Sequence, residues 1–367
     1  MASSFFRKLL LNLSFEDELE VVFNDDDGST SQRGRNRQRR RDHIQEHEQL
    51  FRDYFAEPPV YPSNLFRRRF RMSRPLFLRI LNEVEAYKPY FIQKRDNVGR
   101  LGLSSMQKIT TAIRMLTYGV TADFMDEYIR IGESTAMESL KKFVKTIIIV
   151  FSNEYLWFPN ANDIARLLVV GEQRGFPEML RIIDCMHWKW KHCPAAWKER
   201  YFIFTELVQG RAPEVNYSVN GNEYKMKYYL ADGIYPKWST FVKTIPFSQG
   251  NKKTHFAVAQ ELVRKDVERT FRVLQQRFAI IRGLSRMFKM KDLIYIMKAC
   301  VILHNLIIED ECDDNLVPNI EYDQLDDEFP ELSHNCTTEL MDFIQRHHQI
   351  RDMSAYHQFQ ADLIEHQ

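Results

Sequence analysis

Three acidic side chains stand at positions where carboxylates do chemistry in α/β proteins. Asp184 follows the apolar run EMLRII, and Asp232 follows a second run, YYLA. Functional groups gather at the carboxyl ends of strands in open α/β sheets. Glu268 lies on a long helical pattern, beside its apolar face. Carboxylates that converge from separate elements bind Mg²⁺ or Mn²⁺, and such ions assist phosphodiester cleavage. The three acids therefore predict a metal-dependent site that acts on nucleic acid.

Each acid also has a purely structural interpretation. Asp184 would cap a strand end, and Asp232 would hold a turn with the glycine that follows it. Glu268 has Arg264 and Arg272 four residues before and after it, a spacing that gives helical ion pairs of about 0.2–0.5 kcal/mol each. Spacing alone leaves both interpretations open.

The elements around these acids indicate an α/β fold. Apolar strands are expected near 179–183 and 228–231, and a long helix over 258–282. Residues 292–308 are apolar on nearly all sides, which is typical of a buried helix. Two strands and two helices in this order predict an α/β domain.

The preceding part of the chain has a helical pattern. A helix capped by Ser104 or Ser105 and ended by Gly119, a short helix over 121–128, and a longer helix from Ser134 outline a helix-turn-helix. The exposed head of the third helix would then face a DNA groove. It carries two Glu, however, and a purely structural three-helix bundle is the alternative.

Charge is distributed unevenly along the chain. Residues 1–308 hold 49 basic and 34 acidic side chains, whereas residues 309–367 hold 16 acidic and two basic ones. Residues 33–41, RGRNRQRRR, contain six Arg and predict a disordered arm that binds phosphate or directs the protein to the nucleus; a solubilising linker is the alternative. Five further Arg lie among Phe66 and Phe70 over 67–74, as in a nucleic-acid contact or in a packed segment. A basic body with an acidic tail favours a polyanionic partner.

Cysteine usage and hydropathy exclude other classes. The five Cys are widely spaced and odd in number, which favours a reduced intracellular protein. The C-x-H-x₄-HC spacing over 185–193 fits no standard zinc finger. The longest apolar stretch, 293–308, is too short to span a bilayer, so no membrane partner is expected.

Several blocks of the chain resemble the PIF/Harbinger transposases, and most closely the plant Harbinger-transposase-derived nuclease-like proteins. These blocks are IIDCMHWKWKHCPAAWKERY, YYLADGIYP, VERTFRVLQQRFAIIRG and KACVILHNLIIED. The resemblance implies a ribonuclease-H-like DDE domain with metal-dependent DNA cleavage and strand transfer. By motif, Asp184, Asp232 and Glu268 are the three acids that hold Mg²⁺ or Mn²⁺. A separate Myb-like protein is the partner that the resemblance implies.

The chain departs from the family pattern at one place. In the family, two core strands and a Gly-Ser-x-x-Asp motif follow the CP-x-x-W-K-x-x-Y element, whereas here Phe202 runs directly into Ile203. Such a loss would remove ladder partners from the strand before Asp184. We therefore expect a truncated sheet and a nuclease activity impaired by the loss of the segment between Phe202 and Ile203.

These observations give a domain plan and two hypotheses. We expect an arm over 1–50, a helix-turn-helix-like domain over 51–160, a DDE endonuclease-like domain over 161–312 and an acidic tail with a short helix over 313–367. The first hypothesis is a nuclear, metal-dependent DNA nuclease, in which phosphates are contacted by Arg264, Arg269 and Arg272. The second is a non-catalytic nuclear factor that binds DNA or protein.

Overall fold

The computed structural model describes most of the chain from the first helix to residue 313, and one helix beyond it. The described residues are 43–95, 97, 99–156, 161–183, 188, 191, 217–224, 228–231, 237–245, 250–285, 287, 289–313 and 353–366. Asp184 and Asp232 lie outside these residues, as do the Arg-rich arm over 33–41 and the acidic stretch over 314–352.

Helices dominate the described structure, with two small sheets between them. In chain order the elements are α2 (His43–Tyr54), α3 (Ser63–Phe70), α4 (Arg74–Tyr87), α5 (Ser105–Tyr118), α6 (Ala122–Ile129), α7 (Glu133–Tyr155), α8 (Ala161–Gln173), β1 (Met179–Ile183), β2 (Tyr217–Val219), β3 (Asn222–Tyr224), β4 (Tyr228–Ala231), β5 (Phe241–Lys243), α10 (Asn251–Arg277), the 3₁₀ helix η4 (Ala279–Ile281), α11 (Met290–Asp313) and α13 (Met353–His366).

The helical unit, which α2–α7 form, has the helices that its sequence predicts. The Ser104 hydroxyl accepts from the Gln107 backbone N–H, and the Gln107 side chain accepts from the Ser104 N–H, so a capping box begins α5. Gly119 ends this helix in the left-handed conformation. The Thr121 hydroxyl caps α6. The predicted helix order is confirmed, while the helix-turn-helix role stays a prediction.

The Arg-rich segment forms α3, whose two phenylalanines belong to the core. Phe66 and Phe70 are fully buried, and their rings stack with 4.3 Å between centroids. The Arg69 guanidinium lies 3.9 Å from the centre of the Tyr61 ring. The aromatic residues of this segment therefore serve packing and are not available to stack on bases.

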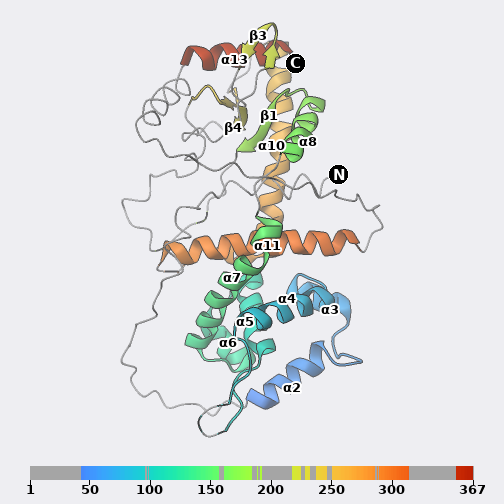
Figure 1. Ribbon diagram of the computed structural model, residues 1–367, viewed down its shortest axis with the longest axis vertical. Coiled ribbons are helices and arrows are strands. Elements are labelled where there is room, and N and C mark those ends of the chain that lie inside the picture. The colour runs from blue at the N-terminus through green and yellow to red at the C-terminus, as the bar shows by residue number, and fades with distance from the viewer. Residues whose placement is uncertain are drawn as a thin grey trace, which may run out of the picture.

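Helix α11 belongs to the same core as α2–α7. Its buried side chains join the cluster that α4, α5 and α7 form, and Lys141 of α7 forms a 2.7 Å ion pair with Asp292 at its start. Figure 1 shows α11 crossing between the helical unit and the sheet. The predicted buried helix over 292–308 is confirmed, and Ala299, Cys300 and Ile302 are among its fully buried residues.

The second unit, called the sheet unit below, is built around β1–β5. It contains a three-stranded parallel sheet with the order β1-β4-β5. Ile183 pairs with Ala231, and Ala231 pairs with Lys243, so the three strands end in register. A separate antiparallel hairpin joins β2 and β3. The two predicted strands are confirmed as β1 and β4. The ribonuclease-H-like class stays a prediction.

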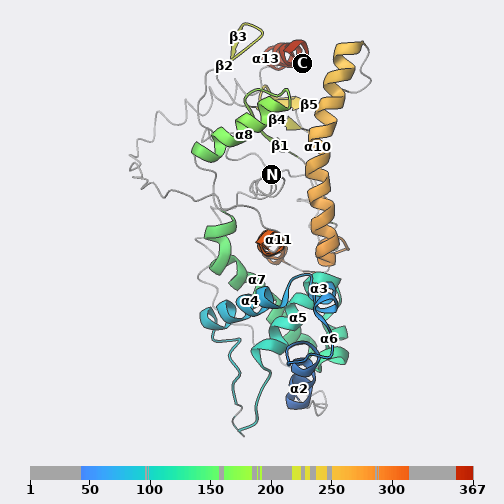
Figure 2. The same ribbon diagram turned by 90° about the vertical axis from the view of Figure 1, so that its right-hand side faces the viewer.

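Helix α10 connects the two cores. Its residues Phe256, Val263 and Val267 are buried against the sheet, and Leu274 near its end enters the helical core. Figure 2 shows this helix running from the sheet to the helical unit. The predicted helix over 258–282 begins earlier, at Asn251, and ends at Arg277.

The last helix, α13, packs onto the sheet unit. Phe359 and Leu363 are buried in its core, and the Phe359 ring lies 4.8 Å from the Tyr228 ring of β4. The Asp362 carboxylate accepts hydrogen bonds from Asn222 at 2.8 Å and from the Tyr224 hydroxyl. Burial and this carboxylate raise the pKa of the Tyr224 hydroxyl. The short helix predicted in the tail is thus an integral part of the second unit.

Candidate active site

The strands that precede the two aspartates end side by side. β1 ends at Ile183 and β4 ends at Ala231, and these two residues are register partners in adjacent parallel strands. Asp184 and Asp232 are the next residues in the sequence. Parallel pairing therefore brings the chain to the same edge of the sheet immediately before each acid.

Two hydrogen bonds orient α10 along β5 toward this edge. The Gln260 side chain donates to the Val242 carbonyl at 2.8 Å. One turn later, Arg264 donates to the Thr244 hydroxyl at 3.2 Å, directly after β5 ends. Glu268 lies one further turn along the same face, about 6 Å beyond Arg264. The helix thus carries Glu268 in the direction in which the strands end.

Two arginines flank Glu268. Arg264 and Arg272 each approach its carboxylate to 3.7 Å, from one turn before and one turn after. The Glu268 side chain is 34% exposed, so solvent screens these pairs and each is worth a few tenths of a kcal/mol. The ion pairs that the structural interpretation predicts are present. A metal ion at Glu268 would have to compete with two guanidinium groups.

The three predicted DNA-binding arginines differ in exposure. The side chains of Arg269 and Arg272 are 69% and 76% exposed. That of Arg264 is only 8% exposed and is anchored to Thr244. Arg269 and Arg272 have the access that a phosphate contact needs, whereas Arg264 acts within the protein by fixing α10 to the sheet.

Among the described residues, β1 pairs with a neighbouring strand on one side only, and that strand is β4. Two described residues that follow β1 in the sequence contact the loop before α11. The Trp188 indole donates to the Gly283 carbonyl at 3.1 Å, and the Lys191 N–H donates to the Ser285 carbonyl at 2.9 Å. The segment that follows Asp184 is therefore attached, at these two points, to the loop before α11.

Over the residues that the structure describes, no group of three or more His, Cys, Asp and Glu side chains could hold a metal ion. Because Asp184 and Asp232 are not among those residues, this result does not bear on the predicted triad. A groove of about 310 Å³ lined by Leu262 and Asp266 lies beside α10. Positions 262 and 266 lie on the other side of this helix from 264 and 268, so the groove is separate from Glu268.

The first turns of α7, which the helix-turn-helix prediction places in a DNA groove, are acidic, and one of their lysines is already in an ion pair. Glu133 and Glu138 are exposed, and Lys141 is paired with Asp292 of α11. Side chains of this charge repel phosphate. The geometry thus favours the alternative of a structural three-helix bundle for α5–α7.

A family model described as "plant transposon protein" matches residues 153–202 and 199–315. The match supports a transposase-derived origin. It covers less than half of the chain but includes β1, β4, α10 and α11, the elements that surround the predicted site. Its two segments overlap at residues 199–202, next to the Phe202–Ile203 junction.

A second family model, described as a domain of unknown function, matches residues 47–85. This range contains most of α2, all of α3 and most of α4, with the aromatic cluster around Tyr54. No curated protein and no solved structure matches the chain significantly. Among the helices that the structure describes, none is both long and apolar enough to cross a bilayer.

Sequence reasoning missed the contacts that complete the sheet unit. Gln260 and Thr244 fix α10 to β5, and Asp362 holds the β2–β3 hairpin. Gln260 on the apolar face of a helix was an available signal, because a buried amide requires a partner. The docking of α13 had no signal in spacing, since more than a hundred residues separate it from β4.

Proposed function

We propose that this chain is a DNA endonuclease-like protein of the PIF/Harbinger lineage, in which Asp184, Asp232 and Glu268 hold Mg²⁺ or Mn²⁺. The register of Ile183 with Ala231 carries the proposal, because the chain enters both aspartate positions from neighbouring strand ends. The anchoring of α10 by Gln260 and Arg264 supports the inclusion of Glu268.

The donor set suits the metal. Three carboxylates offer the oxygen ligands that hard divalent cations prefer, and a bound ion would supply charge stabilisation to the attacking and leaving oxygens of a phosphodiester. The protein's own residues would orient the DNA. Arg269 and Arg272 would contact phosphates beside the acids, and Arg264, held by Thr244, would keep Glu268 facing the edge of the sheet.

Metal binding and cleavage test this proposal in the full-length protein. We expect Mn²⁺ to raise the melting temperature of the wild type and to support cleavage of duplex DNA. Asp184→Asn and Asp232→Asn should abolish both effects. Glu172→Gln, an exposed acid on α8, is the matched control and should behave as the wild type. An Asp184→Asn protein that cleaves DNA at the wild-type rate would refute the proposal.

A second function, that of a non-catalytic nuclear factor that binds DNA or a Myb-like protein, has observations of its own. Glu268 already has two cationic partners, and the family match divides at 199–202, as a missing stretch of the family sequence would cause. This function predicts salt-sensitive DNA binding with no cleavage and no Mn²⁺ effect on melting. It also predicts that the wild type and Asp184→Asn bind DNA equally well.

A further inference from the structure

The described residues between α4 and α5, which are 88–95, 97 and 99–104, form a narrow hairpin that projects from the helical unit (Figure 2). Arg95 and Leu101 form an antiparallel bridge. The Gly102 N–H donates to the Lys94 carbonyl at 2.9 Å, and the Gln93 side chain donates to the Gly102 carbonyl at 2.9 Å. These cross-links make the two limbs an ordered ribbon.

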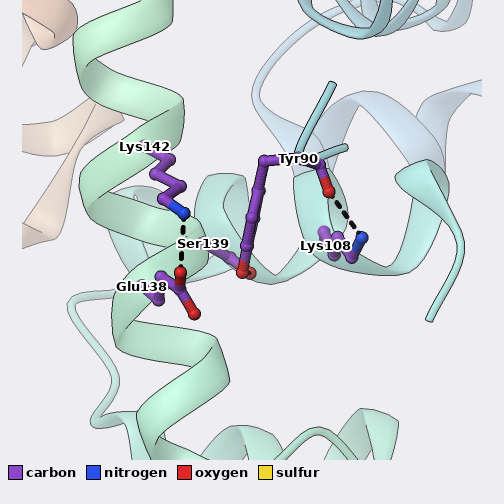
Figure 3. A network of polar contacts seen from close by, with 5 residues as sticks. All are labelled: Tyr90, Lys108, Glu138, Ser139 and Lys142. Atoms are coloured by element: carbon purple, nitrogen blue, oxygen red, sulfur yellow. Dashed lines mark hydrogen bonds and ion pairs between the residues drawn. The ribbon is translucent and has the colours of Figure 1, made fainter. Parts of the chain in front are cut away.

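The base of the hairpin is fixed to the bundle through Tyr90 (Figure 3). The Tyr90 ring stands between two lysines, with the Lys142 amino group 4.0 Å and the Lys108 amino group 4.9 Å from its centre. Its hydroxyl lies 3.1 Å from the Ser139 hydroxyl, and its carbonyl accepts from Lys108 at 2.7 Å. The neighbouring Phe91 is fully buried. The hairpin therefore projects from a base that these contacts hold against the helices.

The hairpin carries a concentration of positive charge. Residues 88–104 contain four basic residues, Lys88, Lys94, Arg95 and Arg100, and one acidic residue. All four basic residues are exposed. At the base, burial and the charges of Lys94 and Lys142 lower the pKa of Lys108, against opposing effects of Glu138 and Glu85. The charge of Lys94 on the hairpin is therefore felt at Lys108 in its base.

The adjacent head of α7 has the opposite charge. Glu133 and Glu138 are exposed there, and the basic Lys142 of the next turn is paired with Glu138 at 2.7 Å. Within this part of the helical unit, the hairpin and not the helix end has the charge that phosphates attract.

We propose that this basic hairpin, and not the head of α7, is the element of the helical unit that contacts DNA. The major groove of a duplex admits a two-stranded ribbon, and the two cross-linked limbs of the hairpin carry Lys94, Arg95 and Arg100, whose charges would attract phosphates. Because phosphate contacts carry no sequence information directly, the hairpin would position the duplex. The inference rests on the DNA association that the proposed function requires, and it does not require cleavage.

Salt-dependent binding of the full-length protein to a fluorescent 30-bp duplex tests the proposal, with the triple variant Lys94→Gln, Arg95→Gln, Arg100→Gln. We expect its dissociation constant to rise by about a hundredfold near 0.1 M salt, and its log–log salt slope to decrease by about 2 to 3. The matched control is the triple variant Lys237→Gln, Lys253→Gln, Lys289→Gln, which removes the same charge from exposed positions elsewhere. The control should keep most of the wild-type slope.

The outcomes separate this inference from the proposed function. If the wild type binds DNA and the two triple variants bind it equally well, the role of the hairpin in DNA binding is refuted. The proposed function is then unaffected. A wild type that binds no DNA would overturn both. Poly-glutamate serves as the competing probe. If the hairpin variant lost affinity for poly-glutamate and kept its affinity for DNA, the partner would be an acidic protein and the inference would be wrong.

Discussion

The helical unit and the sheet unit each complete their cores with a helix from a distant part of the chain, α11 in one and α13 in the other. The helical core draws on α2–α7, which follow one another in the chain, and adds α11 and the end of α10. The sheet core takes Phe359 and Leu363 from α13, far beyond the strands they cover. Contacts between distant segments cost more chain entropy to form. The comparison shows that the sheet unit, whose strands β1 and β4 precede the two predicted aspartates, depends on α13, whereas the helical unit depends on α11.

The strongest test of this difference removes a core ring from α13. Phe359→Ala should lower the free energy of unfolding of the sheet unit by about 3–5 kcal/mol, because a buried ring is replaced by a cavity. Hydrogen exchange should show lost amide protection in β1, β4 and β5. Protection in α4 and α5 should remain.

The control for this change lies on the same helix. Met353 is 46% exposed, and Met353→Ala should alter the free energy by less than about 0.5 kcal/mol. Equal loss of protection in both units of Phe359→Ala would show that they unfold as one cooperative body.

Acid should affect the helical core through His304. Burial, and next the charge of Arg277, lower the pKa of His304 from 6.5 to about 3. The unfolded state therefore binds a proton at a pH where the folded state does not, and stability falls as the pH drops below 6.5. Between pH 7.5 and 4.5 this group should cost about 3 kcal/mol.

Urea unfolding across that pH range measures the effect. His304→Leu has no imidazole to protonate, so its stability should fall less steeply over the same interval, whatever its value at neutral pH. An unchanged pH slope in His304→Leu would show that other groups cause the acid sensitivity.

Gly119 tests how the two units are joined. Its φ is +65°, and a Cβ there would lie 3.2 Å from the backbone of Ala279 in η4, the segment that follows α10. Gly119→Ala should destabilise the protein by about 2 kcal/mol or more, through the left-handed backbone and the close contact together. Gly99 also has a positive φ, but nothing lies within 4 Å of its Cβ position, so Gly99→Ala should cost about 1 kcal/mol. Equal melting temperatures for the two variants would contradict the close packing on η4.

The smallest expected effect concerns the start of α5. Ser104→Ala removes the capping hydroxyl and should cost about 1 kcal/mol in thermal unfolding. Ser105→Ala, one residue later, leaves the capping box intact and should change the stability by less than about 0.5 kcal/mol. A larger loss of stability in Ser105→Ala than in Ser104→Ala would show that Ser105, and not Ser104, caps the helix.

Local rules in the sequence determined the elements of this protein. Capping residues and helical periodicity gave α5, α6 and the buried face of α10, because these signals act within one or two turns. The apolar runs gave β1 and β4 for the same reason. The two ion pairs of Glu268 follow from their spacing on one helix. The triad of Asp184, Asp232 and Glu268 stays a prediction, since both aspartates lie outside the described residues.

Tertiary structure alone decided how these elements meet. It set the strand order β1-β4-β5 and the common ending of Ile183 and Ala231. It buried Arg264 while leaving Arg272 exposed, although both lie four residues from Glu268. It also brought α13 onto β4 and fixed the basic hairpin through Tyr90. Each of these results depends on contacts between distant residues, which no local pattern encodes.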